Sequence, residues 1–390
     1  MPADWSARLI AAANRDNETL NCRCSTSATR GLLLEAPGIF QEHAALALAD
    51  FARAGDAPLR DLRSDTVATQ FEVTVTPPAR NLLVARMTVP GGPWPGHFGL
   101  EAIVFDAFKA GFPEWFPALD TGYSLDFADV ITASNAFMRG QGAVLFPELL
   151  ALRERLERQS FGVVFLDRLT ALYVSRVLPA LAELRIEATT GTEEARTIRQ
   201  LAFLAHEWGH LHGPVPYEET VRARRRRLIA IISELYADLA GLAMLLDVGT
   251  AVAKQAAEVL ILDRIAREAW LPRARSQVDS VTARQLLMLL RETSYAEMAP
   301  DGIRLSLERA EQRLRQELSA VREVDAACAQ GDVEPARRYL ASYGWRLDDS
   351  GFQVDLHDRL SQLLRAAAEK IRDRKVSTAA KLASLPMPHS

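Results

Sequence analysis

The spacing of apolar residues changes twice along the chain, near residue 65 and near residue 147. Before residue 65, apolar positions recur at helical intervals in Trp5–Asn14 and Pro37–Ala54. Between the two changes, apolar and polar residues alternate, as in Phe71–Val75, which is typical of a half-buried strand. After residue 147 the helical spacing returns. We therefore expect a helical start, a middle region that contains strands, and a long helical second half.

Short apolar runs divide the middle region into elements. The expected strands are Phe71–Val75, Leu82–Val89, Val130–Thr132 and Ala143–Phe146. Two prolines separate the first two strands and a glycine-containing turn separates the last two, so each couple is expected to pair as a hairpin. The apolar run Glu101–Ala110 is expected to be a helix.

The second half carries the longest apolar stretches. The expected helices are Phe165–Ile186, Glu193–His212, Leu260–Trp270, Ser280–Arg291, Ile303–Gln330, Pro335–Tyr343 and Val354–Arg374, with a further apolar helix around Glu234.

Leu201–Pro214 reads Leu-Ala-Phe-Leu-Ala-His-Glu-Trp-Gly-His-Leu-His-Gly-Pro. On a helix, His206 and His210 lie on one face about one turn apart, so both imidazoles can bind one metal ion. A zinc ion held there keeps positions open for a third protein ligand and for water, and the adjacent Glu207 can accept a proton from that water. This is the His-Glu-x-x-His motif of the zincin enzymes, and it predicts Zn²⁺ as the cofactor.

The surroundings of the motif favour a buried metal site over a solvated helix that carries these residues by coincidence. Leu201–Ala205 are apolar all round, so the helix is expected to be buried. Buried imidazoles and a buried carboxylate need a metal ion or a hydrogen-bond network, because their desolvation otherwise costs several kcal/mol. Gly213 and Pro214 are expected to end the helix.

A second apolar helix carries Glu234 in the run Ser-Glu-Leu-Tyr-Ala-Asp. Glu234 and Asp238 are four residues apart, so both can face the first helix. A Glu-x-x-Ala-Asp element downstream of His-Glu-x-x-His resembles the gluzincins, metallopeptidases whose third zinc ligand is a glutamate on a second helix. The resemblance implies that His206, His210 and Glu234 bind zinc. It also implies that Glu207 is the general base and that Asp238 orients a histidine ligand by hydrogen bonding. Salt bridges to nearby arginines are the alternative role for Glu234 and Asp238.

A weaker resemblance concerns the segment that follows the strand Val130–Thr132. There Asn-Ala-Phe, a glycine turn, an apolar strand and a Leu-Leu helix are similar to the segment ahead of the zinc helix in metallopeptidases of the CAAX-prenyl-protease type. In that family the edge strand binds the substrate backbone by strand addition. The resemblance implies that Asn135, Ala136 and Phe137 bind an extended peptide, and an ordinary β-hairpin is the alternative.

These features together predict an α+β fold that is mostly helical, with a zincin-like catalytic core, a small mixed or antiparallel sheet and flanking helical regions. We expect an N-terminal helical region at residues 1–65 and the catalytic domain at 66–250. A C-terminal helical domain is expected at 251–376, and a disordered tail at 377–390.

Composition adds limits on partners and location. A net charge of −4 and 48% hydrophobic residues over 390 residues give no electrostatic argument for nucleic-acid binding. Leu239–Leu262 is the most apolar long window, but it contains three charged residues, so no membrane span is expected. The abundance of arginine, alanine and leucine is typical of a high-GC bacterial coding sequence.

The amino terminus and the cysteines indicate where the protein is located. The first residues have neither a basic nor an apolar region of the kind found in signal peptides, so none is expected. Three cysteines are too few for a disulfide framework. We expect Cys22, Cys24 and Cys328 to be reduced thiols of a cytoplasmic protein.

Two further features have open roles. The run Arg222–Arg227 is expected to be a solvated helix face, with binding of an anionic substrate or partner as the alternative. A second group that stabilises an oxyanion is also expected of a hydrolase. Its candidates are Tyr217, Arg273, Arg275, Tyr295 and His357.

Three functions fit the sequence. The favoured one is a zinc-dependent metallopeptidase that cleaves a peptide or a peptide-like amide. The second is a zincin-fold enzyme recruited to a small-molecule biosynthetic reaction, and the third is a non-catalytic helical interaction protein with a structural metal site. Glu207 argues against the third, because a structural site needs ligands but no base. The expected substrate is therefore a peptide or a small molecule, and the sequence specifies no oligomeric state.

Overall fold

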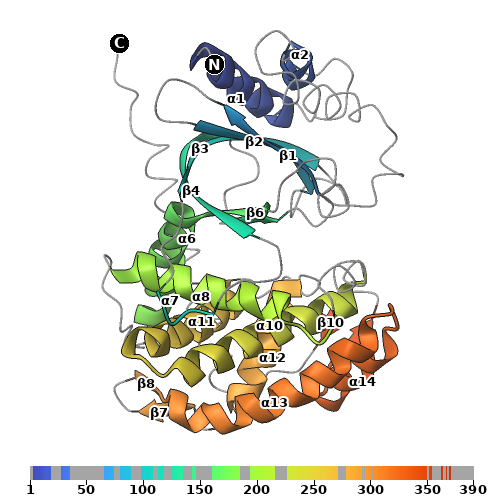
Figure 1. Ribbon diagram of the computed structural model, residues 1–390. Helices are drawn as coiled ribbons and strands as arrows, with labels where there is room; N and C mark the ends of the chain where they lie inside the picture. Colours follow the sequence, from blue (N-terminus) through green and yellow to red (C-terminus); the bar gives the residue numbers. More distant parts are fainter. Residues whose placement is uncertain are drawn as a thin grey trace. The chain divides into compact units, whose positions relative to one another are not determined.

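The computed structural model describes residues 3–18, 28–35, 66–73, 80–88, 98–108, 113–117, 124–134, 143–145, 160–184, 194–215, 226–270, 278–291, 293, 295–299, 302–348, 351–353, 362, 366 and 369. The chain forms two compact units, Met1–Leu169 and Thr170–Ser390 (Figure 1). The division falls inside residues 66–250, the stretch expected as one catalytic domain, and the expected limits at residues 65, 250 and 376 stay predictions.

Unit 1 combines two helices with a mixed sheet. The helices are α1 (Ala3–Glu18) and α2 (Ala28–Leu34). The strands are β1 (Thr66–Val73), β2 (Arg80–Thr88), β3 (Phe98–Phe108), β4 (Ser124–Ala133), β5 (Ala143–Leu145) and β6 (Ser160–Phe165). Their order is β1-β2-β3-β4-β6-β5, and every neighbouring pair is antiparallel except the parallel pair β4–β6. The sheet and the helical remainder of the chain confirm the α+β class and the mixed sheet.

The core of unit 1 lies where α1 packs against β3. Trp5 and Leu9 on α1 are buried, and so is Phe105 on β3, whose ring meets the ring of Phe165 edge to face at 5.5 Å. Burial of these large side chains supplies the main favourable term for folding of this unit.

The structure corrects the expected helix at Glu101–Ala110, because the described part of this stretch, residues 101–108, belongs to β3. Ala102, Ile103, Val104 and Phe105 are consecutive and all buried. β3 pairs with β2 on one side and β4 on the other, so it is a central strand. A continuous apolar run does not distinguish such a strand from a buried helix.

The pairing of the later strands also differs from expectation. The hairpin of β1 and β2 is confirmed, but β5 pairs with β6 and not with β4. β6 was expected to be part of a helical region. Its six residues were too few to stand out from the helical pattern that follows them.

Unit 2 is built mainly of helices. They are α6 (Leu166–Leu172, which begins in unit 1), the π-helical turn η2 (Tyr173–Val177), α7 (Leu178–Glu183), α8 (Glu194–Leu211), α10 (Arg227–Val248), α11 (Ala251–Trp270), α12 (Val278–Arg291), α13 (Leu307–Cys328) and α14 (Glu334–Ser342). Two short hairpins that the sequence did not predict complete it: β7 (Ala296–Ala299) with β8 (Gly302–Leu305), and β9 (Arg346–Asp348) with β10 (Gly351–Gln353). The helix expected at Pro37–Ala54 lies outside the described residues, as does most of Val354–Arg374.

The helix α10 is the core of unit 2. It packs against α8, α11, α12 and α13, and Gly249 ends it with a left-handed φ of 68°. By length and composition alone α10 could cross a membrane, with a mean hydropathy of 1.8, but 83% of its apolar window is buried inside the protein. Such burial is typical of the core helix of a helical unit, so the length and apolar composition of α10 are only weak evidence for a membrane span.

Candidate metal centre

The zinc-motif histidines lie on α8, on the face that packs against α10. This part of α8 is buried, as shown by its residues Leu201, Leu204 and Ala205. His206 and His210 are themselves buried, with 8% and 4% of their surface exposed. Because they are one helical turn apart, their rings meet at 4.6 Å between centroids, edge to face.

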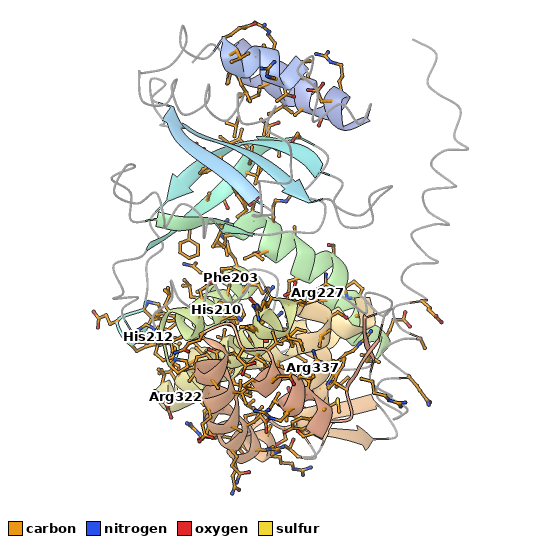
Figure 2. All side chains as sticks on the ribbon, turned by 90° about the vertical axis from the view of Figure 1, so that its right-hand side faces the viewer. Phe203, His210, His212, Arg227, Arg322 and Arg337 are labelled. Atoms are coloured by element: carbon orange, nitrogen blue, oxygen red, sulfur yellow. The ribbon has the colours of Figure 1, made fainter. Side chains whose placement is uncertain are left out.

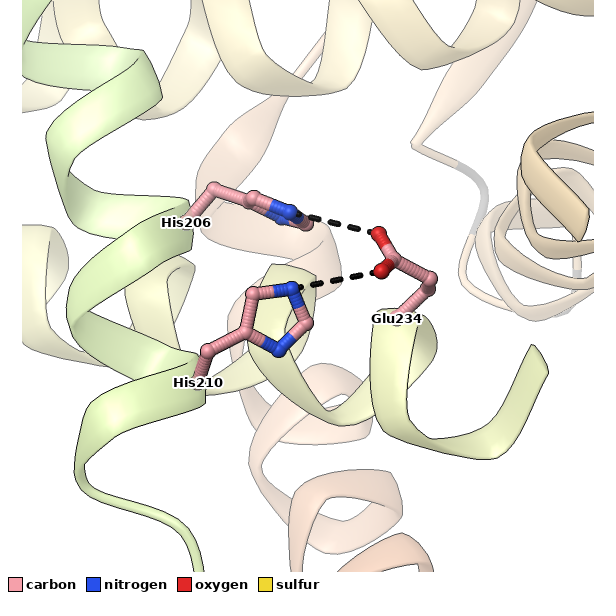
Figure 3. Close-up of side chains that lie close together, drawn as sticks. All are labelled: His206, His210 and Glu234. Carbon is pink, nitrogen blue, oxygen red and sulfur yellow. Dashed lines mark ion pairs between the residues drawn. The ribbon is translucent and has the colours of Figure 1, made fainter. Parts of the chain in front are cut away.

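Glu234 on α10 lies opposite both imidazoles (Figure 3). Its Oε2 is 3.3 Å from Nε2 of His206, and its Oε1 is 3.3 Å from Nε2 of His210. Unlike the histidines, the Glu234 side chain is 20% exposed, so the group is reachable from solvent on this side. One donor atom from each of the three residues lies within 4.8 Å of the others, and this is the group found among the described residues that could hold a metal ion.

These distances fit a zinc ion. Zinc bonds to nitrogen and carboxylate oxygen are about 2.0–2.2 Å long in tetrahedral sites, which places neighbouring donor atoms roughly 3.3–3.5 Å apart. Each carboxylate oxygen of Glu234 lies 3.3 Å from Nε2 of a different histidine, which is a distance of this size. Two imidazoles and one carboxylate also form a donor set that catalytic zinc uses.

Glu207 lies beside this group without belonging to it. Its side chain is 3% exposed, and its Oε1 is 3.9 Å from Nε2 of His206. The Glu207 carboxylate thus lies at the edge of the donor group, while Glu234 supplies the oxygen nearer to His206.

The far side of the His206 ring contacts Asp238. Nδ1 of His206 and Oδ1 of Asp238 are 2.7 Å apart, and Asp238 is fully buried on α10. Arg264 on α11 contacts the same carboxylate twice, from Nη2 to Oδ1 at 2.8 Å and from Nε to Oδ2 at 2.7 Å. His206, Asp238 and Arg264 therefore form a buried chain that joins three helices.

The charges of His206, Asp238, Arg264 and Glu234 set the pKa values of His206 and Asp238. Burial alone lowers the pKa of His206, but Asp238 and Glu234 outweigh burial and raise it to about 10. Burial alone raises the pKa of Asp238, whereas Arg264 and His206 lower it, with a net decrease. Asp238 is therefore an ionised carboxylate, which accepts hydrogen bonds and donates none.

Two glycines bring α8 and α10 into backbone contact. A Cβ added to Gly209 would lie 2.4 Å from the carbonyl oxygen of Ala237, and one added to Gly241 would lie 2.4 Å from that of Ala205. Each helix thus places a glycine against an alanine of the other. This close crossing lets the short Glu234 side chain span the gap to both histidines.

The end of α8 is held separately. His212 stacks on Trp208 with 4.4 Å between ring centroids, and its Nδ1 lies 2.9 Å from the Trp208 carbonyl oxygen. The Tyr236 hydroxyl on α10 donates a hydrogen bond to the His212 carbonyl oxygen at 3.1 Å. His212 therefore lies just past His210 (Figure 2) and is engaged with the end of α8.

Several residues expected at the site cannot be placed with it. Asn135, Ala136 and Phe137 lie outside the described residues, as do the oxyanion candidates Tyr217, Arg273, Arg275 and His357. Tyr295 is described and is buried, with 1% of its surface exposed. Of the arginine run, Arg226 and Arg227 are exposed at the start of α10, and the Arg226 guanidinium donates to the carbonyl oxygen of Gly331.

Sequence reasoning missed Arg264 and the glycine contacts. Arg264 did leave a signal, because Asp263 and Arg264 interrupt the apolar run Val259–Ile265 inside a helix. A charged pair in such a run needs buried partners. The glycines also left one: Ala205 and Gly209 are four residues apart, as are Ala237 and Gly241, and two small residues at this spacing allow close helix packing.

No protein-family profile matches the chain, and no curated protein matches it in sequence. Among solved structures, it is similar to DPP III from Caldithrix abyssi, with a TM-score of 0.54 and 13% identity over 92% of this chain and 70% of that one. Dipeptidyl-peptidase III from Corallococcus sp. strain EGB aligns at a TM-score of 0.48, with 16% identity, 87% of this chain and 66% of that one covered. The first likeness concerns the fold, and it shows that this chain shares the fold of the Caldithrix abyssi DPP III.

Proposed function

We propose that the protein is a zinc-dependent metallopeptidase that cleaves a peptide or peptide-like amide. The observation that carries the proposal is the convergence of His206, His210 and Glu234 from two helices, with Glu207 beside them. Such a donor set with an adjacent carboxylate is the arrangement of catalytic zinc sites rather than structural ones.

In this proposal each residue has one task. His206, His210 and Glu234 would hold the zinc ion through two Nε2 atoms and a carboxylate. When bound, zinc supplies a Lewis acid that polarises the scissile carbonyl and lowers the pKa of water toward about 7. Glu207 accepts the proton of the attacking water and returns it to the leaving amine. Asp238 accepts the hydrogen bond from Nδ1 of His206, which leaves Nε2 as the nitrogen that would bind the metal ion.

A peptide substrate is favoured by the fold, which is that of a DPP III. The edge-strand hypothesis for Asn135, Ala136 and Phe137 remains a prediction, like the similarity to CAAX-prenyl proteases. One observation supports it: among the described strands, Asp129–Ala133 pairs only with β3, because β6 covers only Ser124–Ala128 of β4. The last residues of β4 thus have a backbone edge to which an extended peptide could add.

The test combines metal content with turnover on one preparation. We expect about one zinc per chain, lost on chelation and restored by added zinc. Activity should be measured on dipeptidyl arylamides, on their N-acetylated forms and on single-residue arylamides, because the DPP III likeness makes dipeptide release the first activity to examine.

The decisive variant is Glu207→Gln. It should keep zinc and fold but lose turnover by roughly 10²-fold to 10⁴-fold, the range of a general base. Glu323→Gln, an exposed change on α13, is the matched control and should keep full activity. A zinc-loaded Glu207→Gln protein with wild-type turnover would refute the mechanism. Zinc binding with no turnover of any peptide would instead favour the small-molecule reaction.

A further inference from the structure

Arg264 is a buried cation in the middle of an apolar helix. Only 3% of its surface is exposed. Besides its two contacts with Asp238, its guanidinium lies 3.5 Å from Asp279 and 3.9 Å from Glu234. Its Nη2 is also 3.4 Å from Nδ1 of His206. One guanidinium thus faces the metal-binding glutamate, the carboxylate behind His206 and the His206 ring itself.

The contact with Asp238 uses the shape of the arginine side chain. A guanidinium is planar and presents parallel N–H groups, so it can hold both oxygens of a carboxylate in one plane. Nη2 donates a hydrogen bond to Oδ1, and Nε lies 2.7 Å from Oδ2 as an ion pair. This two-point contact fixes the rotation of the Asp238 carboxyl group. A lysine in the same place offers a single ammonium group, which cannot fix both oxygens.

The fixed carboxylate in turn determines how His206 is presented. Oδ1 of Asp238 is shared by Nη2 of Arg264 and Nδ1 of His206. Because the carboxylate only accepts hydrogen bonds, Nδ1 of His206 carries a hydrogen, and Nε2 is the nitrogen that can give up its proton to bind a metal ion. Nε2 is the atom that lies 3.3 Å from Glu234. The orientation of His206 at the donor group therefore depends on the orientation of Asp238.

We infer that Arg264 is a positioning residue of the metal centre: it locks the Asp238 carboxylate, and through Asp238 it fixes the tautomer and ring orientation of the ligand His206. The inference rests on the proposed function, since it assumes that His206 binds zinc. It adds a third helix, α11, to the site. This helix supplies none of the three proposed zinc ligands, but its Arg264 orients the ligand His206.

A second buried arginine provides the matched control. Arg199 on α8 is 4% exposed and pairs with Asp263 of α11 at 3.4 Å. Its guanidinium also lies over the Tyr173 ring at 5.5 Å. Arg199 therefore ties α8 to α11 as a buried ion pair does, through Asp263 and not through Asp238. Its replacement reports the effect of losing a buried arginine contact on the fold alone.

The first experiment compares Arg264→Lys with Arg199→Lys. Zinc affinity is measured by competition with a chromophoric chelator, site geometry by the visible absorption of the cobalt(II)-substituted protein, and stability by thermal unfolding. Both variants should unfold at lower temperature. Arg264→Lys should also lose about 10-fold to 100-fold in zinc affinity and change the cobalt spectrum, whereas Arg199→Lys should change neither. A wild-type affinity and spectrum in Arg264→Lys would overturn the inference.

The second experiment is a double-mutant cycle, which also covers the case in which Arg264→Lys does not fold. The variants are Arg264→Met, Asp238→Asn and the double variant, which removes both buried charges together and so avoids an unpaired one. If Arg264 acts through Asp238, the double variant binds zinc as tightly as Asp238→Asn. A further loss equal to that of Arg264→Met alone would overturn the inference. If the wild-type protein binds no zinc, the proposed function fails instead, so the two failures are distinguishable.

Discussion

The close crossing of α8 and α10 makes a quantitative prediction for Gly241→Ala. The new Cβ would lie 2.4 Å from the carbonyl oxygen of Ala205 and 2.6 Å from its carbonyl carbon. Ordinary van der Waals contact begins at 3.4 Å, so α8 has to retreat by about 1 Å. Both close atoms are backbone, and no side-chain rotation relieves the clash. Overpacking of this kind destabilises a protein by about 1–3 kcal/mol.

The same retreat opens the metal centre. Ala205 precedes His206 directly, so the shift moves the histidines away from Glu234. The two donor contacts of 3.3 Å would lengthen by up to about 1 Å, whereas metal-site distances tolerate only about 0.2 Å. We expect a loss of zinc affinity on the order of 100-fold, similar to the rate penalty for misplacing a reacting group by 1 Å.

The assay is chelator competition for zinc, with thermal unfolding on the same samples. Gly31→Ala is the matched control, because Gly31 lies in α2 with nothing within 4 Å of an added Cβ. That variant should bind zinc normally and be as stable as the wild type or slightly more so. Wild-type zinc affinity in Gly241→Ala would refute the reasoning, since the helices would then separate without disturbing the donors.

Three further predictions follow from individual residues. Glu234→Ala should lose zinc binding more severely than Asp238→Ala, which should weaken it about 10-fold to 100-fold; equal losses would mean that Glu234 is not a ligand. Ala136→Pro should abolish peptide turnover and leave zinc content intact, because proline removes a backbone donor from the expected edge strand; unchanged kinetics would contradict strand addition. Burial raises the pKa of Cys328 from 9.0 to about 11, so the folded protein holds this proton more tightly and stability should fall as pH rises from about 9 to 11. Thermal unfolding of Cys328→Ala through the same pH range checks this, and an equal fall in that variant would rule out the thiol as its cause.

The parts of the site that the sequence predicted are local. His206 and His210 share a face because a helix repeats every 3.6 residues, and this geometry needs no tertiary information. Glu234 needed the family resemblance as well, because nothing in the spacing says that a second helix crosses at that height. The structure brings its carboxylate between the two imidazoles.

The parts that escaped prediction depend on tertiary packing. β3 looked like a helix because a strand paired on both sides can be apolar at every position, as Ala102–Phe105 are. The sequence does not show that Gly241 packs against the backbone of Ala205 on another helix. Arg264 belongs to a helix that carries no motif, and its partner Asp238 lies on another helix. Each of these facts concerns which elements become neighbours, and local periodicity does not specify neighbours.

The adjacent residues Asp263 and Arg264 also restrict how α11 can be seated. Asp263 contacts Arg199 of α8, and Arg264 contacts Asp238 of α10. Neighbouring residues on a helix point about 100° apart, so the two charges address two different helices at once. Leucine, isoleucine and alanine side chains along α11 would tolerate a small rotation or slide of the helix, because apolar contacts have little directional preference. Any such movement that kept one ion pair would break the other and leave a buried charge without its partner. These two residues thus select a single register among the many that the apolar surface of α11 would accept.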